Sequence, residues 1–230
     1  MSPELIFLGF VLMILCAGLV TVFMMAFYQG KAIKALVFKG LASLCFLIYG
    51  ALNCFLGEVS PTAVLIFVGL CLGIIGDEII ALCQVFPEHD ARAFIGGGSF
   101  FLIGHLIYML SLLLIGEINI IALVISAVLV AIPGGIYARY KKFLVGKMKT
   151  PLSIYIGIVI LVTAVATGVF FARGSLGAGL FALGGLFFTF SDNLLFAYKC
   201  GENPFFKQNV ALHIAYYIAQ FCIAWSIQLL

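Results

Sequence analysis

Apolar residues fill the chain in runs of about 20, and short polar segments separate one run from the next. A transmembrane α-helix needs about 20 consecutive apolar residues, so these runs predict membrane-spanning helices. With Gly, Pro and charged residues taken as breaks, there are eight such helices. Their bounds are about 3–28, 36–56, 61–83, 93–115, 119–138, 152–172, 175–198 and 208–229. The pattern therefore predicts an all-α polytopic membrane protein, with eight transmembrane helices in one bundle and a single domain over residues 1–230.

Composition agrees with this class, because 65% of the residues are hydrophobic and only 9% are charged. The first apolar run continues to Tyr28 with no basic segment before it, which is typical of a retained helix and not of a cleaved signal peptide. The seven cysteines form no CxxC motif, so we expect small buried hydrophobic residues, not disulfides or a thiolate metal site. The net charge of +3 does not indicate nucleic-acid binding.

Basic residues are distributed unevenly between the two sides of the predicted bundle. Lys39 is set aside, because it belongs to the start of the second predicted helix, and Arg173 falls on the other side. The remaining basic residues fall on one side: Lys31, Lys34, Arg92, Arg139, Lys141, Lys142, Lys147, Lys149, Lys199 and Lys207. Cytoplasmic loops are enriched in Lys and Arg. We therefore expect an integral protein of the plasma membrane with both termini extracytoplasmic.

Two aspartates, Asp77 and Asp192, lie inside long apolar runs. A carboxylate at the centre of a membrane helix costs about 2.5 kcal/mol or more, so such a residue indicates a functional site. Asp77 precedes Gln84 by seven residues, and Asp192 precedes Lys199 by seven. At about 1.5 Å per residue, both lie roughly 10 Å from the cytoplasmic interface.

Other polar side chains fall at similar depths on four further predicted helices, which indicates a pocket opening toward the inner leaflet or the cytosol. They are Lys39, His105, Tyr108, Tyr137, Tyr216, Tyr217 and Gln220. Structural roles stay open for several of them. Either aspartate could be a buried carboxylate paired only with Lys39, and His105, Tyr216 and Gln220 could be interhelical hydrogen-bonding residues. The roles of Glu78 and His213 are open, and His89 is expected in a solvated loop.

Two buried carboxyl groups suit acid–base chemistry. Burial disfavours the charged form, and a second carboxylate nearby does so further, so that such a pair offers one protonated acid and one charged base. Glycosidases cleave acetal-type C–O bonds with this arrangement. In a membrane, the corresponding acid-labile substrate is a lipid vinyl ether. No cofactor or metal is expected, since a three-histidine zinc site would need all three histidines of the chain.

Four motifs together resemble the YhhN-like lysoplasmalogenase family from about Lys39 to the C-terminus. They are Gly76-Asp77; Phe94, Gly97, Phe101, His105 and Tyr108; Gly184, Phe188 and Ser191-Asp192; and Tyr216-Tyr217-Ile218-Ala219-Gln220. The resemblance implies an eight-helix membrane enzyme that hydrolyses the vinyl ether of a lysoplasmalogen. The products would be a fatty aldehyde and glycerophosphoethanolamine or glycerophosphocholine. It also implies that Asp77 and Asp192 are catalytic. We expect the substrate to contact Lys39, His105, Tyr108, Ser191, Tyr216, Tyr217 and Gln220.

The chain departs from this family pattern at two places. The family usually has Lys-Pro where this chain has Lys39-Gly40, and Glu78 beside Asp77 is not expected. A second hypothesis is a non-enzymatic lipid-binding or transport protein that uses the same pocket. Under either hypothesis, we expect a lysophospholipid and membrane lipid as partners, with no nucleic acid and no protein partner.

Overall fold

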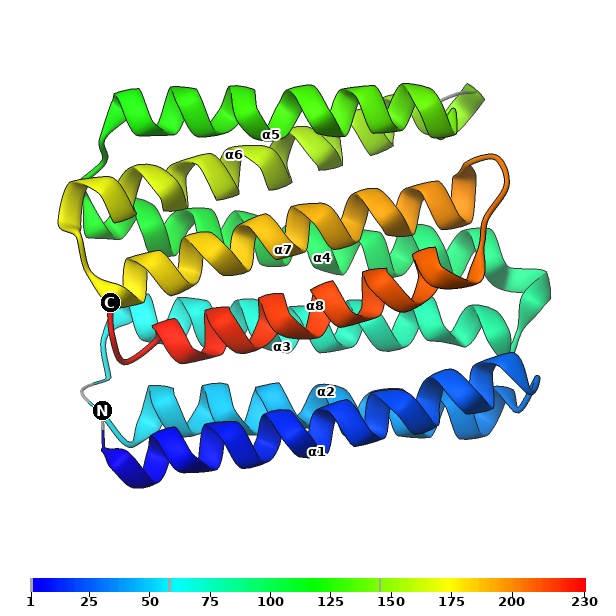
Figure 1. Ribbon diagram of the computed structural model, residues 1–230, viewed down its shortest axis with the longest axis horizontal. Coiled ribbons are helices and arrows are strands. Elements are labelled where there is room, and N and C mark those ends of the chain that lie inside the picture. The colour runs from blue at the N-terminus through cyan, green and yellow to red at the C-terminus, as the bar shows by residue number, and fades with distance from the viewer. Residues whose placement is uncertain (1, 58, 145) are drawn as a thin grey trace. The chain divides into compact units, whose positions relative to one another are not determined.

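The computed structural model describes residues 2–57, 59–144 and 146–230, in which all regular structure is helical (Figure 1). Short 3₁₀ turns follow α3 and precede α4 and α6. The α-helices are α1 (Pro3–Tyr28), α2 (Ala32–Phe55), α3 (Pro61–Ala81), α4 (Asp90–Ile115), α5 (Ile120–Lys141), α6 (Lys149–Arg173), α7 (Leu176–Cys200) and α8 (Phe206–Ser226). The predicted all-α class is therefore confirmed for the described residues.

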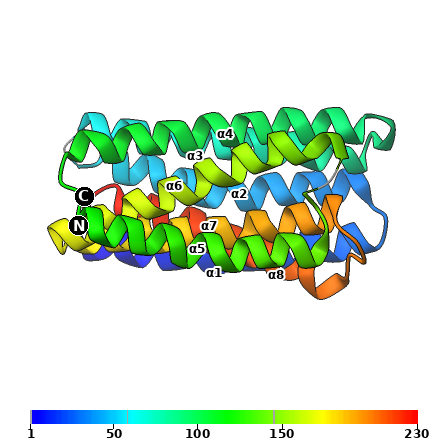
Figure 2. The same cartoon turned by 90° about the horizontal axis from the view of Figure 1, so that it is seen from above.

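The helices form two compact units. Unit 1 extends to Ser111 and contains α1, α2, α3 and most of α4, whereas unit 2 is Leu112–Leu230 and contains α5 to α8. Within unit 1, α2 packs against both α1 and α3. Within unit 2, α7 packs against α5, α6 and most extensively α8 (Figure 2). The single domain over residues 1–230 stays a prediction.

Seven of the helices, α1 to α7, are long and apolar enough to cross a membrane, which indicates a multi-pass membrane protein. The eighth, α8, is less apolar because it carries Asn209, His213 and Gln220, all of which are buried. It nevertheless runs along nearly the whole of α7. Near its start, the Gln208 amide donates to the Leu194 carbonyl (3.1 Å), and the residues after its end pack against Gly177.

Local sequence explains where several helices begin. The side chains of Ser60, Asn119 and Ser175 each accept a hydrogen bond from a backbone N–H of the first helical turn. One predicted start was wrong. The second helix begins at Ala32, not near residue 36, so Lys39 lies in its third turn and is only 3% exposed.

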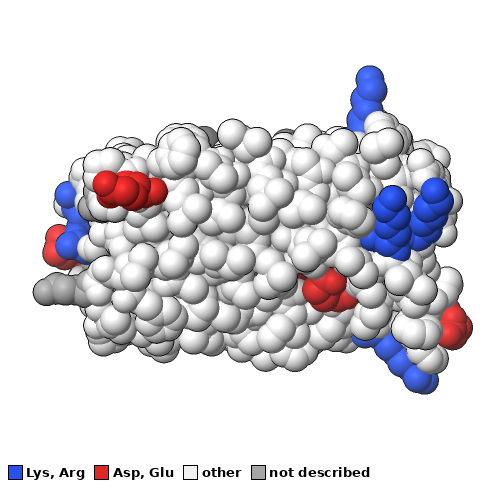
Figure 3. Space-filling view, turned by 90° about the horizontal axis from the view of Figure 1, so that it is seen from below, with Lys and Arg blue, Asp and Glu red and all other residues white. Residues whose placement is uncertain are grey.

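Each unit carries its basic side chains mainly at helix ends, and the lengths between the ends are almost uncharged on the face that Figure 3 shows. In unit 2, the end of α5 and the α7–α8 connection lie together, because the Glu202 backbone N–H donates to the Lys141 carbonyl (2.9 Å). At the opposite end, the Arg173 guanidinium donates to the Leu230 carbonyl (3.2 Å). Arg173 therefore lies at the end of unit 2 opposite to the one that carries Lys141.

Candidate functional site

In unit 1, Asp77 is the centre of a buried polar group that we call the Asp77 cluster, formed by Lys39, Ser43 and Asp77. The Lys39 ammonium lies 2.7 Å from Asp77 Oδ1 and donates to the Asp77 backbone carbonyl at 2.8 Å. The Ser43 hydroxyl donates to Asp77 Oδ2 at 3.2 Å. Lys39 and Ser43 are one helical turn apart on α2, so one face of α2 supplies both partners of the carboxylate.

Close packing of α3 against α4 fixes the turn of α3 that carries Asp77. A Cβ on Gly76 would lie 2.7 Å from the Gly97 carbonyl oxygen and 3.0 Å from the Phe101 ring. A Cβ on Gly97 would lie 2.5 Å from the Gly76 carbonyl oxygen. Only glycine at both positions allows the two backbones to come this close. The motif residues Gly76, Gly97 and Phe101 therefore serve packing beside Asp77.

His105 and Tyr108 lie further along α4. The His105 ring is 3% exposed, with Nδ1 2.8 Å from the Phe101 carbonyl, and it meets the Tyr108 ring edge-on with centroids 6.1 Å apart. The Tyr108 ring lies directly against Gly69 of α3. Tyr108 thus helps to join α3 and α4, and His105 packs against Tyr108 within α4. Their contact with substrate stays a prediction.

The two departures from the family pattern lie next to one another. A Cβ on Gly40 would be 3.4 Å from Glu78 Oε2, and Oε1 of Glu78 is buried without a hydrogen-bond partner. Glu78 therefore lies over Gly40. Gly40 directly follows Lys39 in the sequence, and Glu78 directly follows Asp77. The absence of a side chain at position 40 leaves room for this extra carboxyl group.

In unit 2, Asp192 is the centre of a second buried group, which we call the Asp192 cluster: Tyr155, Ser191 and Asp192. The Tyr155 hydroxyl donates to Asp192 Oδ2 at 2.9 Å. The Ser191 hydroxyl donates to the Leu212 carbonyl of α8 at 2.9 Å. Consecutive residues of α7 thus face α8 and α6. All three members of the cluster are at most 7% exposed.

The α8 motif that begins at Tyr216 and ends at Gln220 packs against α7. The Tyr216 ring packs edge-on against Phe188 of α7 (5.7 Å between centroids) and against Tyr217 (5.1 Å). The Gln220 amide donates to the Tyr216 hydroxyl at 3.1 Å. Close α7–α8 packing depends on Gly184, whose Cβ would lie 2.7 Å from Ile223 Cγ1.

Two partners of the aspartates, Ser43 and Tyr155, were missed from the sequence. A depth argument could have found Tyr155, because it follows the basic Lys149 by six residues and so lies in the same half of the membrane as Asp192. Lys39 lies beside Asp77, and its contact with substrate stays a prediction. The meeting of Asp77 with Asp192 stays a prediction, because the two residues belong to different units.

The three histidines lie on different elements of the chain. His89 is exposed in a 3₁₀ turn, as expected for a loop residue, while His105 is buried on α4. His213 is 9% exposed on α8, with Nδ1 2.8 Å from the Asn209 carbonyl. Across the described part of the chain, no three His, Cys, Asp or Glu side chains are grouped to hold a metal ion.

The geometry thus provides two buried carboxyl groups with different partners. Asp77 is paired with an ammonium group, whereas the side-chain partner of Asp192 is a neutral hydroxyl. A buried carboxylate beside a cation keeps its charge and suits a base, whereas a buried carboxyl group without a countercharge holds a proton more readily and suits an acid.

A sequence model of the YhhN family matches residues 34–227. No curated protein and no solved structure matches the chain significantly. The matched range begins in α2 and extends through α8, so it includes the whole of both clusters.

Proposed function

Because the chain belongs to the YhhN family, we propose that it is a lysoplasmalogenase, an eight-span enzyme of the plasma membrane. The observation that carries the proposal is the presence of two buried aspartates, each in a hydrogen-bonded cluster inside the family-matched range. Buried carboxyl groups in membrane helices are costly and are typical of functional sites. The proposed substrate is a lysoplasmalogen with an ethanolamine or choline headgroup.

The proposed reaction begins when a carboxylic acid transfers its proton to the alkene carbon that is not bonded to the ether oxygen. The resulting oxocarbenium ion takes up water, which loses a proton to the carboxylate base. The hemiacetal that forms then breaks its C–O bond, and a fatty aldehyde and a glycerophospho-alcohol leave. The sum is the addition of one water molecule across one ether bond, so no electron acceptor is required.

The partners of the two aspartates suggest how these roles are divided. Lys39 favours the charged form of Asp77, so we assign Asp77 as the base. Tyr155 gives Asp192 a hydrogen bond but no countercharge, so we assign Asp192 as the proton donor. In this scheme Lys39 and Tyr155 position the carboxyl groups.

The test is release of fatty aldehyde from lysoplasmalogen by the purified protein. We expect release in the presence of EDTA or phenanthroline, because the scheme uses only carboxyl groups. Loss of release on chelation and its return with zinc would overturn the scheme. A protein that binds lysoplasmalogen but releases no aldehyde would instead be a lipid-binding or transport protein.

A further inference from the structure

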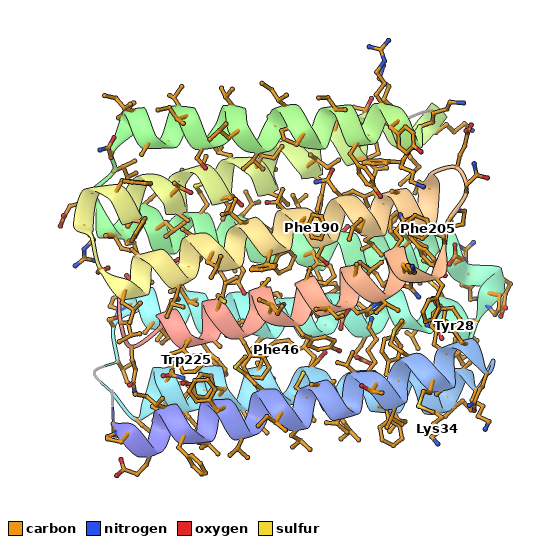
Figure 4. The ribbon with its side chains drawn as sticks, in the orientation of Figure 1. Tyr28, Lys34, Phe46, Phe190, Phe205 and Trp225 are labelled. Atoms are coloured by element: carbon orange, nitrogen blue, oxygen red, sulfur yellow. The ribbon has the colours of Figure 1, made fainter. Side chains whose placement is uncertain are left out.

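A groove of about 390 Å³ lies between α5 and α7 inside unit 2. Its lining is mostly apolar and includes Leu129, Pro133, Leu186 and Phe190, the last of which is labelled in Figure 4. At its edge, Leu129 is 67% and Phe190 54% exposed, so the groove opens sideways, where a membrane supplies hydrocarbon. Its volume lies within the range of about 300–1,000 Å³ that is usual for small-molecule sites.

Asn193 places a hydrogen-bond acceptor in this groove. Its amide nitrogen donates to the Thr189 carbonyl at 2.8 Å, and a carbonyl can only accept, so the other amide atom is the oxygen. That oxygen is buried and has no hydrogen-bond partner, and Asn193 is 7% exposed. The Asn193 amide group lies against α5, because a Cβ on Gly134 would lie 3.6 Å from its oxygen and 3.7 Å from its nitrogen.

A buried acceptor without a partner costs about 1–3 kcal/mol, so it favours a ligand that donates a hydrogen bond. Among the described residues, the Asn53, Gln208 and Gln220 amide oxygens are also buried without a partner, but only Asn193 lines this groove. Pro133 has no backbone N–H, so the Leu129 carbonyl one turn before it lacks its usual helical hydrogen bond. This carbonyl is a second acceptor for a ligand that donates a hydrogen bond. Both residues line the groove.

The chemistry of the groove distinguishes between classes of lipid. Apolar walls fit a hydrocarbon chain, and the neutral acceptor fits a hydroxyl group. The charged groups nearest along α5 are Arg139 and Lys141, one turn beyond the groove-lining Tyr137, where a phosphate would be favoured. A glycerophospholipid with one chain has a free glycerol hydroxyl beside that chain, whereas a two-chain glycerophospholipid has none.

We propose that the α5–α7 groove binds a glycerophospholipid with a single chain, whose free glycerol hydroxyl donates to Asn193 Oδ1. This inference rests on the proposed function only for the link to catalysis. Asn193 follows Asp192 directly in α7, and one residue is about 1.5 Å of helical rise, so a glycerol held by Asn193 lies at nearly the same depth along α7 as Asp192.

The first experiment fills the groove. Gly134→Leu places a side chain beside Asn193 Oδ1, whereas Gly135→Leu is the matched control, since a Cβ at Gly135 meets nothing within 4 Å. The probe is a saturated 1-alkyl lysophospholipid with a photoreactive chain, which has no vinyl ether to hydrolyse. We expect about a tenfold or greater loss of labelling in Gly134→Leu and ordinary labelling in Gly135→Leu. Equal labelling of the two variants would overturn the groove as the binding site.

The second experiment needs no variant to fold, because it compares two probes on the unmodified protein. Methylation of the glycerol hydroxyl removes the donor, so the methylated probe should bind roughly two- to tenfold more weakly. Asn193→Leu should abolish this preference. Equal affinities for both probes in the unmodified protein would overturn the hydroxyl assignment.

Aldehyde release distinguishes this inference from the proposed function. If labelling follows the expected pattern and the unmodified protein releases no aldehyde, the groove stands and the enzyme proposal falls. If aldehyde is released and Gly134→Leu behaves as Gly135→Leu in both assays, the enzyme proposal stands and the groove falls.

Discussion

Asp77 and Asp192 are both buried, but they differ in what their carboxyl groups contact. Asp77 lies 2.7 Å from the Lys39 ammonium, whereas Asp192 accepts a hydrogen bond from the neutral Tyr155 hydroxyl at 2.9 Å. Removing one member of a buried ion pair leaves an uncompensated charge, which costs about 3–5 kcal/mol. An amide in place of Asp192 leaves no such charge and can still accept from Tyr155.

The two asparagine variants should therefore separate activity from stability. We expect Asp77→Asn and Asp192→Asn each to lower kcat for lysoplasmalogen by about a hundredfold or more. Only Asp77→Asn should also lower the free energy of unfolding by several kcal/mol, since it removes the charge of the carboxylate that lies 2.7 Å from the Lys39 ammonium. Chemical unfolding in detergent measures the second effect. Near-normal turnover in either variant would show that the aspartate concerned is structural.

Lys39 itself could bind the lipid phosphate or hold Asp77 ionised, and its contacts favour the second role. We expect Lys39→Met to lower kcat strongly with little change in KM, and to destabilise the protein by about 3–5 kcal/mol. The added change Asp77→Asn should restore much of the stability and none of the activity. Lys34→Met is the control, because Lys34 is exposed on the same helix (Figure 4). A raised KM with an unchanged kcat would instead indicate a phosphate ligand.

At the scale of helices, the α3–α4 contact offers a matched pair of glycines. A Cβ on Gly97 would lie 2.5 Å from the Gly76 backbone oxygen, whereas one on Gly98 meets nothing within 4 Å. Gly97→Ala should therefore cost about 1–3 kcal/mol, because backbone cannot move aside as a flexible side chain can. Gly98→Ala should cost nothing, since alanine favours helix. Thermal unfolding in detergent tests this, and equal stabilities would show that the two helices are not held this closely.

The helices could be predicted from the sequence because twenty-residue apolar runs have few alternatives in a membrane. Their ends were less predictable. Lys39 was expected at a helix start because a charge usually marks the end of an apolar run, but its burial with Asp77 lets α2 extend to Ala32. The rotation of each helix about its axis was not predictable either. Ser43 and Tyr155 face the aspartates only because of packing contacts that hydropathy does not encode.

At the scale of the whole molecule, the proposed mechanism requires that one cluster from each unit act on the same bond. Groups that act as a unit in catalysis are strongly non-additive. The double variant Asp77→Asn/Asp192→Asn should thus have a kcat close to that of the worse single variant. If the two losses multiply, each aspartate acts independently and the paired-carboxylate scheme fails.

The orientation of the chain depends on whether α8 crosses the membrane, as α1 to α7 are apolar enough to do. Its polar residues Asn209, His213 and Gln220 are buried in protein, which removes the main cost of placing them at membrane depth. Contacts with α7 from Leu194 to Gly177 span 17 residues, or about 26 Å, close to the thickness of the hydrocarbon layer. We therefore expect α8 to cross.

With eight crossings and basic residues on the cytoplasmic side, a reporter fused after Leu230 should be extracytoplasmic. A reporter inserted between Lys142 and Lys147 should be cytoplasmic. Changing the basic residues of that connection to glutamine should weaken this orientation, whereas Arg173→Gln should leave it unchanged, because Arg173 lies at the opposite end of unit 2 with Leu230. A cytoplasmic reporter at the C-terminus, together with a cytoplasmic one in the basic connection, would mean an even number of crossings after that connection. In that case α8 would lie against α7 without crossing, and Tyr216, Tyr217 and Gln220 would have to reach the Asp192 cluster from the cytoplasmic side.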